Sequence, residues 1–271
     1  GDVYKRQALR RHPVHIGPGG EGADLPSGEN GTSDSWISGQ EGDGNYLALS
    51  AEEIELLQNL KALKDNGTFK NIIVLINSSN ALEMDFLNPA ICGEDYGIDA
   101  AMWIGDVGQT GINGVGQLLS GAVTPSGSLV DTYLYDNMAN PAMYNFYTQA
   151  YPNAAEYNLL TEGADVQGMY SVYQEGIYLG YRYFETVPGA AERVRYPFGF
   201  GLSYTDFELS GVLCGETDGK IVVSVNVKNI GSVPGKETVQ LYYSAPQGVL
   251  GKPAKELAAF AKTHLLNPGE S

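Results

Sequence analysis

The sequence predicts an α/β layer with parallel strands, followed by an incomplete antiparallel β-sandwich. Two observations support this prediction. Between residues 50 and 132, short apolar runs of strand length alternate with segments of helical periodicity, and such alternation is typical of parallel strands joined by helices. Beyond residue 210 the helical periodicity ends, and strands with alternating apolar and polar residues take its place.

The first helix is predicted to begin after Ser50. The hydroxyl of Ser50 can accept a hydrogen bond from a free amide of the first turn, and Glu53 completes a capping box. Apolar residues then recur at helical spacing: Ile54, Leu57, Leu60 and Leu63. The pair Asn66 and Gly67 predicts the end of the helix.

Three strands and two short helices are predicted to follow. The continuous apolar run at residues 72–77 (IIVLIN) suits a parallel strand that is buried on both faces. Residues 81–87 are predicted to form a short helix, and residues 99–105 (DAAMWIG) a second buried strand. Residues 115–120 are predicted as the next helix, and residues 128–132 as a third strand.

A long segment without periodicity follows the α/β pattern. From about residue 141 to residue 172 the chain is rich in Tyr, Asn and Pro, which predicts a surface excursion, and long loops of this kind are often functional. Later, residues 220–229 (KIVVSVNVKN) and 238–245 (TVQLYYSA) alternate as half-buried antiparallel strands do. We expect too few strands to close this sandwich, so its apolar face should be partly unprotected.

The acidic composition restricts the classes of partner. The chain has 32 acidic and 16 basic residues, a formal net charge of −16. Such a surface does not neutralise phosphates, so we expect neither nucleic acid nor an anionic membrane as a partner. No run in the sequence approaches the roughly 18 apolar residues of a membrane span.

No metal or cofactor site is expected. Cys92 and Cys214 are far apart and unpatterned, which excludes a Cys-rich zinc site and a disulfide scaffold. The histidines share no metal-ligand spacing: His12, His15 and His264. The glycines of residues 105–114 lack the spacing of a dinucleotide fingerprint, so no nucleotide cofactor is expected either.

The first 16 residues differ in character from the rest. Residues 2–7 (DVYKRQ) match the conceptual translation of a common sequencing-adaptor end, and the residues that follow them have no periodicity. We therefore interpret residues 1–16 as a non-native leader produced by adaptor read-through, and exclude them from the fold prediction.

The most distinctive stretch is YPFGFGLSYTDF, residues 196–207. It is too irregular for a helix and too rich in glycine for a plain strand. Gly199 and Gly201 let the backbone take a positive φ or pass close to a bulky group. Residue types alone favour a structural turn that joins two domains. Together with YQEGIYLGYRYFET at residues 173–186, the stretch resembles the segment that closes the α/β sandwich domain of glycoside hydrolase family 3.

Further segments extend this resemblance from about residue 19 to the end of the chain. Residues 76–87 are similar to the family's strand and turn ending in Asn-x-x-Asn-x-x-Glu. Residues 103–133 are similar to its glycine-rich helix entry and its Asn-Pro-Ser-Gly-Arg-Leu strand, with Thr124 and Ser128 in place of the usual Asn and Arg. Residues 251–271 resemble the start of the appended fibronectin type III-like domain.

The resemblance implies a domain organisation. Residues 17–209 would form an α/β sandwich with a mostly parallel sheet, and residues 210–271 a truncated fibronectin type III-like domain. Family members hydrolyse glycosides with two carboxylates from two domains. An aspartate nucleophile lies on a (β/α)₈ barrel, and a glutamate general acid/base lies on a loop of the α/β sandwich, often within Ser-Gly-Glu-Gly-x-Asp-Arg.

The same resemblance implies a catalytic residue. The segment GGEGADLP at residues 19–26 matches the acid/base motif, with Gly20 for Ser and Leu25 for Arg, so Glu21 is the implied general acid/base. This role requires a carboxyl that is protonated as the leaving-group oxygen departs and ionised when it activates water. Residue type alone would make Glu21 a solvated loop carboxylate. Asp24 and Glu41 are the rival carboxylates.

The sequence contains no recognisable nucleophile. A retaining glycosidase needs two carboxyls about 5–5.5 Å apart, and this chain supplies one. The resemblance therefore implies a fragment of a retaining exo-acting β-glycosidase for β-glucosides or β-xylosides, whose partner is the missing barrel domain of the same polypeptide. Two alternatives stay open: a non-catalytic carbohydrate-binding module that uses the aromatic loop between Tyr144 and Tyr183, and a scaffold.

Overall fold

The chain forms two compact units, each built from segments that are distant in the sequence. The computed structural model describes residues 47–78, 80–145, 175–249 and 251–271. The first unit comprises Gly1–Asp106 and Thr132–Tyr196, and the second comprises Val107–Asp131 and Pro197–Ser271.

Helix α2, Ala51–Asp65, begins and ends where the sequence predicts. The backbone N–H of Ser50 donates to Glu53 Oε2 over 2.8 Å, and the N–H of Glu53 donates to Ser50 Oγ over 3.3 Å, so the capping box is formed. Gly67 follows the helix with φ +82°, a conformation that favours glycine. Leu57 is the buried residue of the predicted apolar stripe.

Strands β1, Ile73–Ile76, and β2, Ala100–Trp103, form a parallel pair, with Ile73 opposite Ala100 and Ile76 opposite Trp103. Both predicted strands are therefore confirmed. The expected burial on both faces is not found, because Ile76 is buried whereas Ile73 is exposed. The described residues place only these two strands in this sheet, so part of each strand lacks a covering neighbour among them.

An ion pair joins helix α2 to the residues that precede both strands. Lys64 Nζ lies 2.7 Å from Asp99 Oδ2, and the backbone N–H of Ile72 donates to the same oxygen over 2.7 Å. The hydrogen bond from Lys64, followed by that from Ile72, lowers the pKa of Asp99 below its ordinary value of 3.8.

The free energy of unfolding should therefore fall in acid. A lowered folded-state pKa gives a contribution that is fully present above the unfolded value of 3.8 and is lost as the pH falls through the folded value. We expect the free energy of unfolding of Asp99→Asn to depend less on pH than that of the parent chain. Urea unfolding between about pH 2 and pH 6 measures this difference. Lys64→Met should raise the Asp99 inflection observed by carboxyl NMR. An inflection at or above 3.8 in the parent chain would contradict this prediction.

The helix predicted at residues 81–87 is wrong over residues 81–84 and is confirmed only at its end, where residues Asp85–Leu87 form the 3₁₀ helix η1. The N–H of Glu83 donates to Leu47 O over 2.8 Å, and the N–H of Met84 donates to Leu134 O over 3.0 Å. Because these amides bond to distant segments, they cannot form the local hydrogen bonds of a helix. A further short helix, α3, Pro89–Cys92, follows η1.

The strand predicted at residues 128–132 is also wrong. Only Leu129 pairs there, accepting from Gly199 N over 2.8 Å and donating to Phe200 O over 2.8 Å. The next strand is β3, Tyr133–Leu134, which is antiparallel to β4, Val194–Tyr196. The described part of the chain thus contains one parallel pair of strands, β1 and β2, so its α/β character is clearest there.

Helices complete both units. Helix α4, Gly108–Leu119, belongs to the second unit and begins seven residues before the helix predicted at residue 115. In the first unit, Leu134, Phe184 and Ala190 form a buried apolar cluster. The other short helices among the described residues of that unit are η2, Asn137–Ala139; η3, Pro141–Asn145; α5, Tyr181–Thr186; and η5, Ala190–Arg193.

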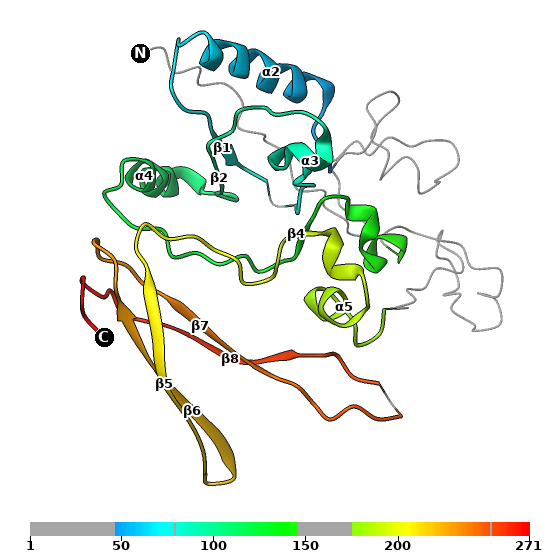
Figure 1. Ribbon diagram of the computed structural model, residues 1–271, viewed down its shortest axis with the longest axis vertical. Coiled ribbons are helices and arrows are strands. Elements are labelled where there is room, and N and C mark those ends of the chain that lie inside the picture. Colours follow the sequence, from blue (N-terminus) through cyan, green and yellow to red (C-terminus); the bar gives the residue numbers. More distant parts are fainter. Residues whose placement is uncertain (1–46, 79, 146–174, 250) are drawn as a thin grey trace, which may run out of the picture. The chain divides into compact units, whose positions relative to one another are not determined.

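The second unit ends in two antiparallel hairpins (Figure 1). The first pairs β5, Phe207–Thr217, with β6, Lys220–Asn229, and the second pairs β7, Thr238–Tyr243, with β8, Glu256–Lys262. Asp218 and Gly219 join β5 to β6 with positive φ values of +53° and +72°, which suits a tight hairpin turn. The strand predicted at residues 220–229 is confirmed, and β7 ends two residues before the predicted limit of 245.

The predicted partial exposure of the apolar face is also confirmed. Leu209 of β5 lies opposite the buried Val227 of β6, yet Leu209 itself is exposed, as are Val212 and Ile221. Among the described residues, no further strand pairs with either edge of this hairpin.

Candidate functional site

The predicted acid/base, Glu21, lies outside the described residues, and so do its rivals Asp24 and Glu41. Most of the tyrosine-rich excursion, residues 146–174, lies outside them as well. Among the described residues, those at the carboxyl ends of the parallel strands β1 and β2 are the candidates for a site. In open α/β sheets, ligands bind in the crevice outside the carboxyl ends of parallel strands.

The turn after β1 and the last residue of β2 are joined by a side chain. The indole Nε1–H of Trp103 donates to the backbone oxygen of Ser78 over 2.9 Å. Ser78 is fully buried, and its hydroxyl donates to Asn80 O over 3.0 Å and accepts from Asn80 N over 3.1 Å. The backbone oxygen that accepts from the indole therefore belongs to a turn that the Ser78 side chain stabilises.

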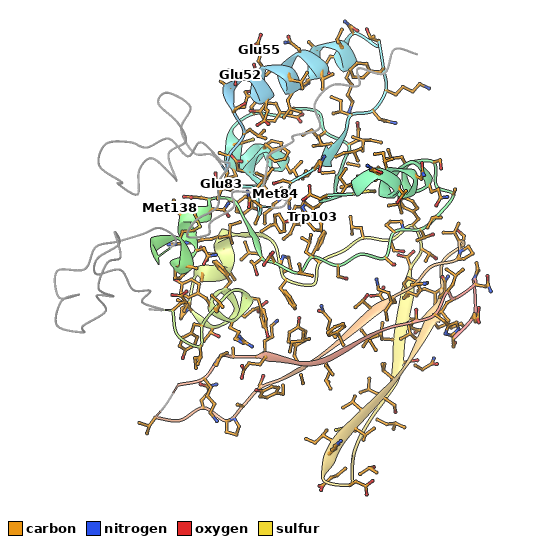
Figure 2. All side chains as sticks on the ribbon, turned by 180° about the vertical axis from the view of Figure 1, so that it is seen from behind. Glu52, Glu55, Glu83, Met84, Trp103 and Met138 are labelled. Carbon is orange, nitrogen blue, oxygen red and sulfur yellow. The ribbon has the colours of Figure 1, made fainter. Side chains whose placement is uncertain are left out.

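The chain after β2 passes against the same indole ring. A Cβ added to Gly105 would lie 3.1 Å from Trp103 Cζ2 and 3.3 Å from Cη2, and Gly105 has φ +54°. Both facts favour glycine at this position. Trp103, labelled in Figure 2, nevertheless keeps 40% of its surface exposed.

A buried carboxylate lies in the segment that follows β1. Glu83 Oε1 accepts from the backbone N–H of Asn137 over 2.8 Å, and Asn137 Nδ2 donates to Ala81 O over 2.8 Å. Both side chains are buried, and Glu83 is labelled in Figure 2. These two bonds hold helix η2 against residues 81–83, so the carboxylate acts as a structural acceptor.

Sequence reasoning did not select Trp103 or Glu83 as site residues. A signal for each was present. Trp103 ends an apolar run and is followed two residues later by a glycine, and Glu83 lies between Leu82 and Met84, both of which are buried. A carboxylate with two apolar neighbours in a turn indicates a buried, hydrogen-bonded role.

Within residues 47–78, 80–145, 175–249 and 251–271, no group of three or more His, Cys, Asp or Glu side chains could hold a metal ion. The helices of these residues include none with the length and hydropathy needed to cross a membrane.

Comparison with known proteins identifies both parts of the chain. Residues 25–181 match the glycosyl hydrolase family 3 C-terminal domain, and residues 237–271 match the fibronectin type III-like domain. β-Glucosidase A of Butyrivibrio fibrisolvens is 40% identical over 243 residues, which is 84% of this chain and 26% of that protein. The β-glucosidase of Ruminococcus albus is 38% identical over 227 residues, which is 84% of this chain and 20% of that protein.

A solved structure agrees with these relatives. β-Glucosidase 3B from Thermotoga neapolitana, in complex with glucose, has a TM-score of 0.65 and 33% identity, over 83% of this chain and 28% of that one. The chain thus spans between a fifth and somewhat more than a quarter of the length of these proteins. Because the family model matches more than half of the chain, the chain belongs to glycosyl hydrolase family 3, of which it carries the C-terminal domain.

Proposed function

We propose that this chain is the acid/base-bearing part of a retaining, exo-acting β-glycosidase that hydrolyses terminal β-glucosides or β-xylosides. The observation that carries the proposal is the match of residues 25–181 to a glycosidase family domain. Relatives that are 38% and 40% identical to the chain are β-glucosidases, which supports the substrate class.

Glu21 is the residue proposed for proton transfer. In the first half of the reaction, its protonated carboxyl gives a proton to the departing glycosidic oxygen while a carboxylate of the barrel domain bonds to the anomeric carbon. In the second half, the ionised carboxylate takes a proton from the water that attacks this carbon and releases the sugar. Gly20 and Gly22 would let the loop approach the sugar closely.

The proposed domains are an α/β sandwich with a mostly parallel sheet at residues 17–209 and a truncated fibronectin type III-like domain at residues 210–271. Support for the sandwich comes from the parallel pair β1–β2. Support for the second domain comes from the antiparallel hairpins and from the match at residues 237–271.

The test uses the full polypeptide that carries this chain together with a barrel domain. We expect Glu21→Gly to lower turnover of aryl β-glycosides by roughly 10²–10⁴-fold, because general acid–base catalysis contributes about that factor. Azide should restore turnover and yield a β-glycosyl azide, since azide needs no general base to attack the glycosyl-enzyme. Glu41→Gly is the matched control and should keep parental activity.

Each other result has a definite meaning. If Glu21→Gly is as active as the parent and Glu41→Gly is slow, the acid/base is Glu41. If the parent polypeptide binds glycosides without turnover, the chain belongs to a binding module. Residues 1–271 alone should show negligible hydrolysis because they supply one catalytic carboxyl. Clear turnover by this chain, lost in Glu21→Ala, would mean that it also contains the nucleophile.

A further inference from the structure

We propose that the indole of Trp103 is a stacking surface for a pyranose ring, and that it forms a sugar-binding subsite at the carboxyl ends of β1 and β2. The inference rests on the proposed function for its ligand class. It assigns a binding role within this chain, independent of the catalytic carboxyl.

The indole ring of Trp103 is held in one orientation. Its Nε1–H is bonded to Ser78 O over 2.9 Å, and its six-membered ring lies against the backbone at Gly105. Two separate contacts, to the turn after β1 and to the residues after β2, therefore fix both side-chain torsions. A ligand that stacks on this ring loses little affinity to ordering of the side chain, because the folded chain has already ordered it.

The exposed surface of Trp103 suits the apolar face of a sugar. With 40% of its surface exposed and its one polar atom already bonded, Trp103 presents mainly aromatic carbon to its surroundings. The face of an aromatic ring carries negative partial charge, and the C–H groups on one face of a β-linked pyranose carry positive partial charge. A flat apolar sugar face therefore matches this surface in shape and in charge.

The position of Trp103 in the sheet also favours a ligand site. Trp103 is the last residue of β2, and the carboxyl ends of parallel strands are where α/β sheets bind ligands. Among the described residues, the other exposed aromatic side chains lack this position. Phe260 and Tyr243 lie on the antiparallel strands β8 and β7, and Tyr204 lies outside the strands.

Intrinsic fluorescence tests the proposal without changing Trp103. The chain has two tryptophans, Trp36 and Trp103, so Trp36→Phe leaves Trp103 as the single tryptophan emitter. We expect cellobiose or xylobiose to shift the emission of this variant with saturation at millimolar concentration, whereas sorbitol, which has no pyranose ring, should not. Gly105→Ala in the same background should weaken the response, because the new methyl group displaces the indole while the tryptophan itself remains.

Kinetics of the full polypeptide provides the second readout. Trp103→Ala should raise KM by roughly two- to tenfold, the range of a single aromatic contact, with kcat almost unchanged. Trp103→Phe should recover part of the loss. A purely structural role would instead lower thermal stability and activity together, without this division between KM and kcat.

The outcomes separate this inference from the proposed function. A saturable sugar response together with an active Glu21→Gly variant would support Trp103 and contradict the assignment of Glu21. Loss of activity in Glu21→Gly together with an unchanged KM in Trp103→Ala and no emission shift would overturn the Trp103 subsite alone. In that case the ring is covered by another part of the polypeptide.

Discussion

Asn229→Ala is expected to destabilise the second unit by about 3–5 kcal/mol, at the upper end of what single substitutions do. Asn229 ends strand β6 and is fully buried. Its Oδ1 accepts from Thr205 Oγ1 over 2.7 Å and from Gly231 N over 3.0 Å. Its Nδ2 donates to Val233 O and to Leu266 O, each over 2.9 Å.

The magnitude follows from the groups left behind. Alanine would leave four partners without the side-chain amide, of which Leu266 O keeps its bond from the N–H of Gly235. Each buried donor or acceptor that is left unsatisfied costs about 1–3 kcal/mol. Water that enters the space left by the amide should satisfy some of these groups. The expected loss of stability is therefore about 3–5 kcal/mol and not the full sum. The replacement also removes a contact among three segments, those at residues 205, 233 and 266.

The measurement is urea unfolding of the chain, followed by circular dichroism. Asn226→Ala is the matched control, since Asn226 is an exposed asparagine of the same strand whose amide lies 3.5 Å from Ser210 Oγ. We expect the control to change the free energy of unfolding by less than about 0.5 kcal/mol. Equal losses in the two variants would show that the buried network does not stabilise the unit.

The hydrogen-bond partners of Asn229 could not be predicted from the sequence. Its strand was predicted from the alternation of residues 220–229, because that signal is local. Its partners Thr205 and Leu266 lie 24 and 37 residues away, and no local pattern indicates them. The capping box at Ser50 was predictable for the opposite reason, since its partner Glu53 is three residues away.

The same distinction explains the wrong predictions. Residues 81–87 have a composition that a helix accepts, but the amides of Glu83 and Met84 bond to Leu47 and Leu134. Tertiary hydrogen bonds overrule weak local propensity in such a segment. The candidate site residues also differ in how far the sequence predicts them. Glu21 was predicted from a motif resemblance, whereas the orientation of Trp103 depends on the oxygen of Ser78, 25 residues earlier.

For the two glycines of the aromatic stretch at residues 196–207, the sequence did not determine which feature of glycine each position requires. The sequence indicated a positive φ or a close approach for this pair. In the structure, Gly199 has φ +83° and its added Cβ would also overlap the side chain of Gln240, whereas Gly201 has no positive φ and lies against another backbone segment. A Cβ on Gly201 would overlap the carbonyl oxygen of Gly127 and would lie 3.5 Å from Ser128 Cα.

Gly201→Ala should therefore destabilise the second unit by about 2–3 kcal/mol, since overpacking of this size forces the backbone to shift. The opposing segment cannot retreat freely, because Leu129 bonds to both Gly199 and Phe200. Gly215→Ala on the exposed strand β5 is the control. No atom lies within 4 Å of its added Cβ and its φ is not positive, so it should be neutral or stabilising by up to about 1 kcal/mol.

Thermal and urea unfolding of Gly201→Ala and Gly215→Ala test whether the close approach of Gly127 causes the loss of stability. If Gly201 is required because its neighbour is close, Gly201→Ser should be at least as destabilising as Gly201→Ala, and Gly127→Ala should be tolerated, since nothing lies within 4 Å of an added Cβ there. If both alanine variants at 201 and 215 unfold like the parent chain, the two segments do not approach each other in solution as they do here.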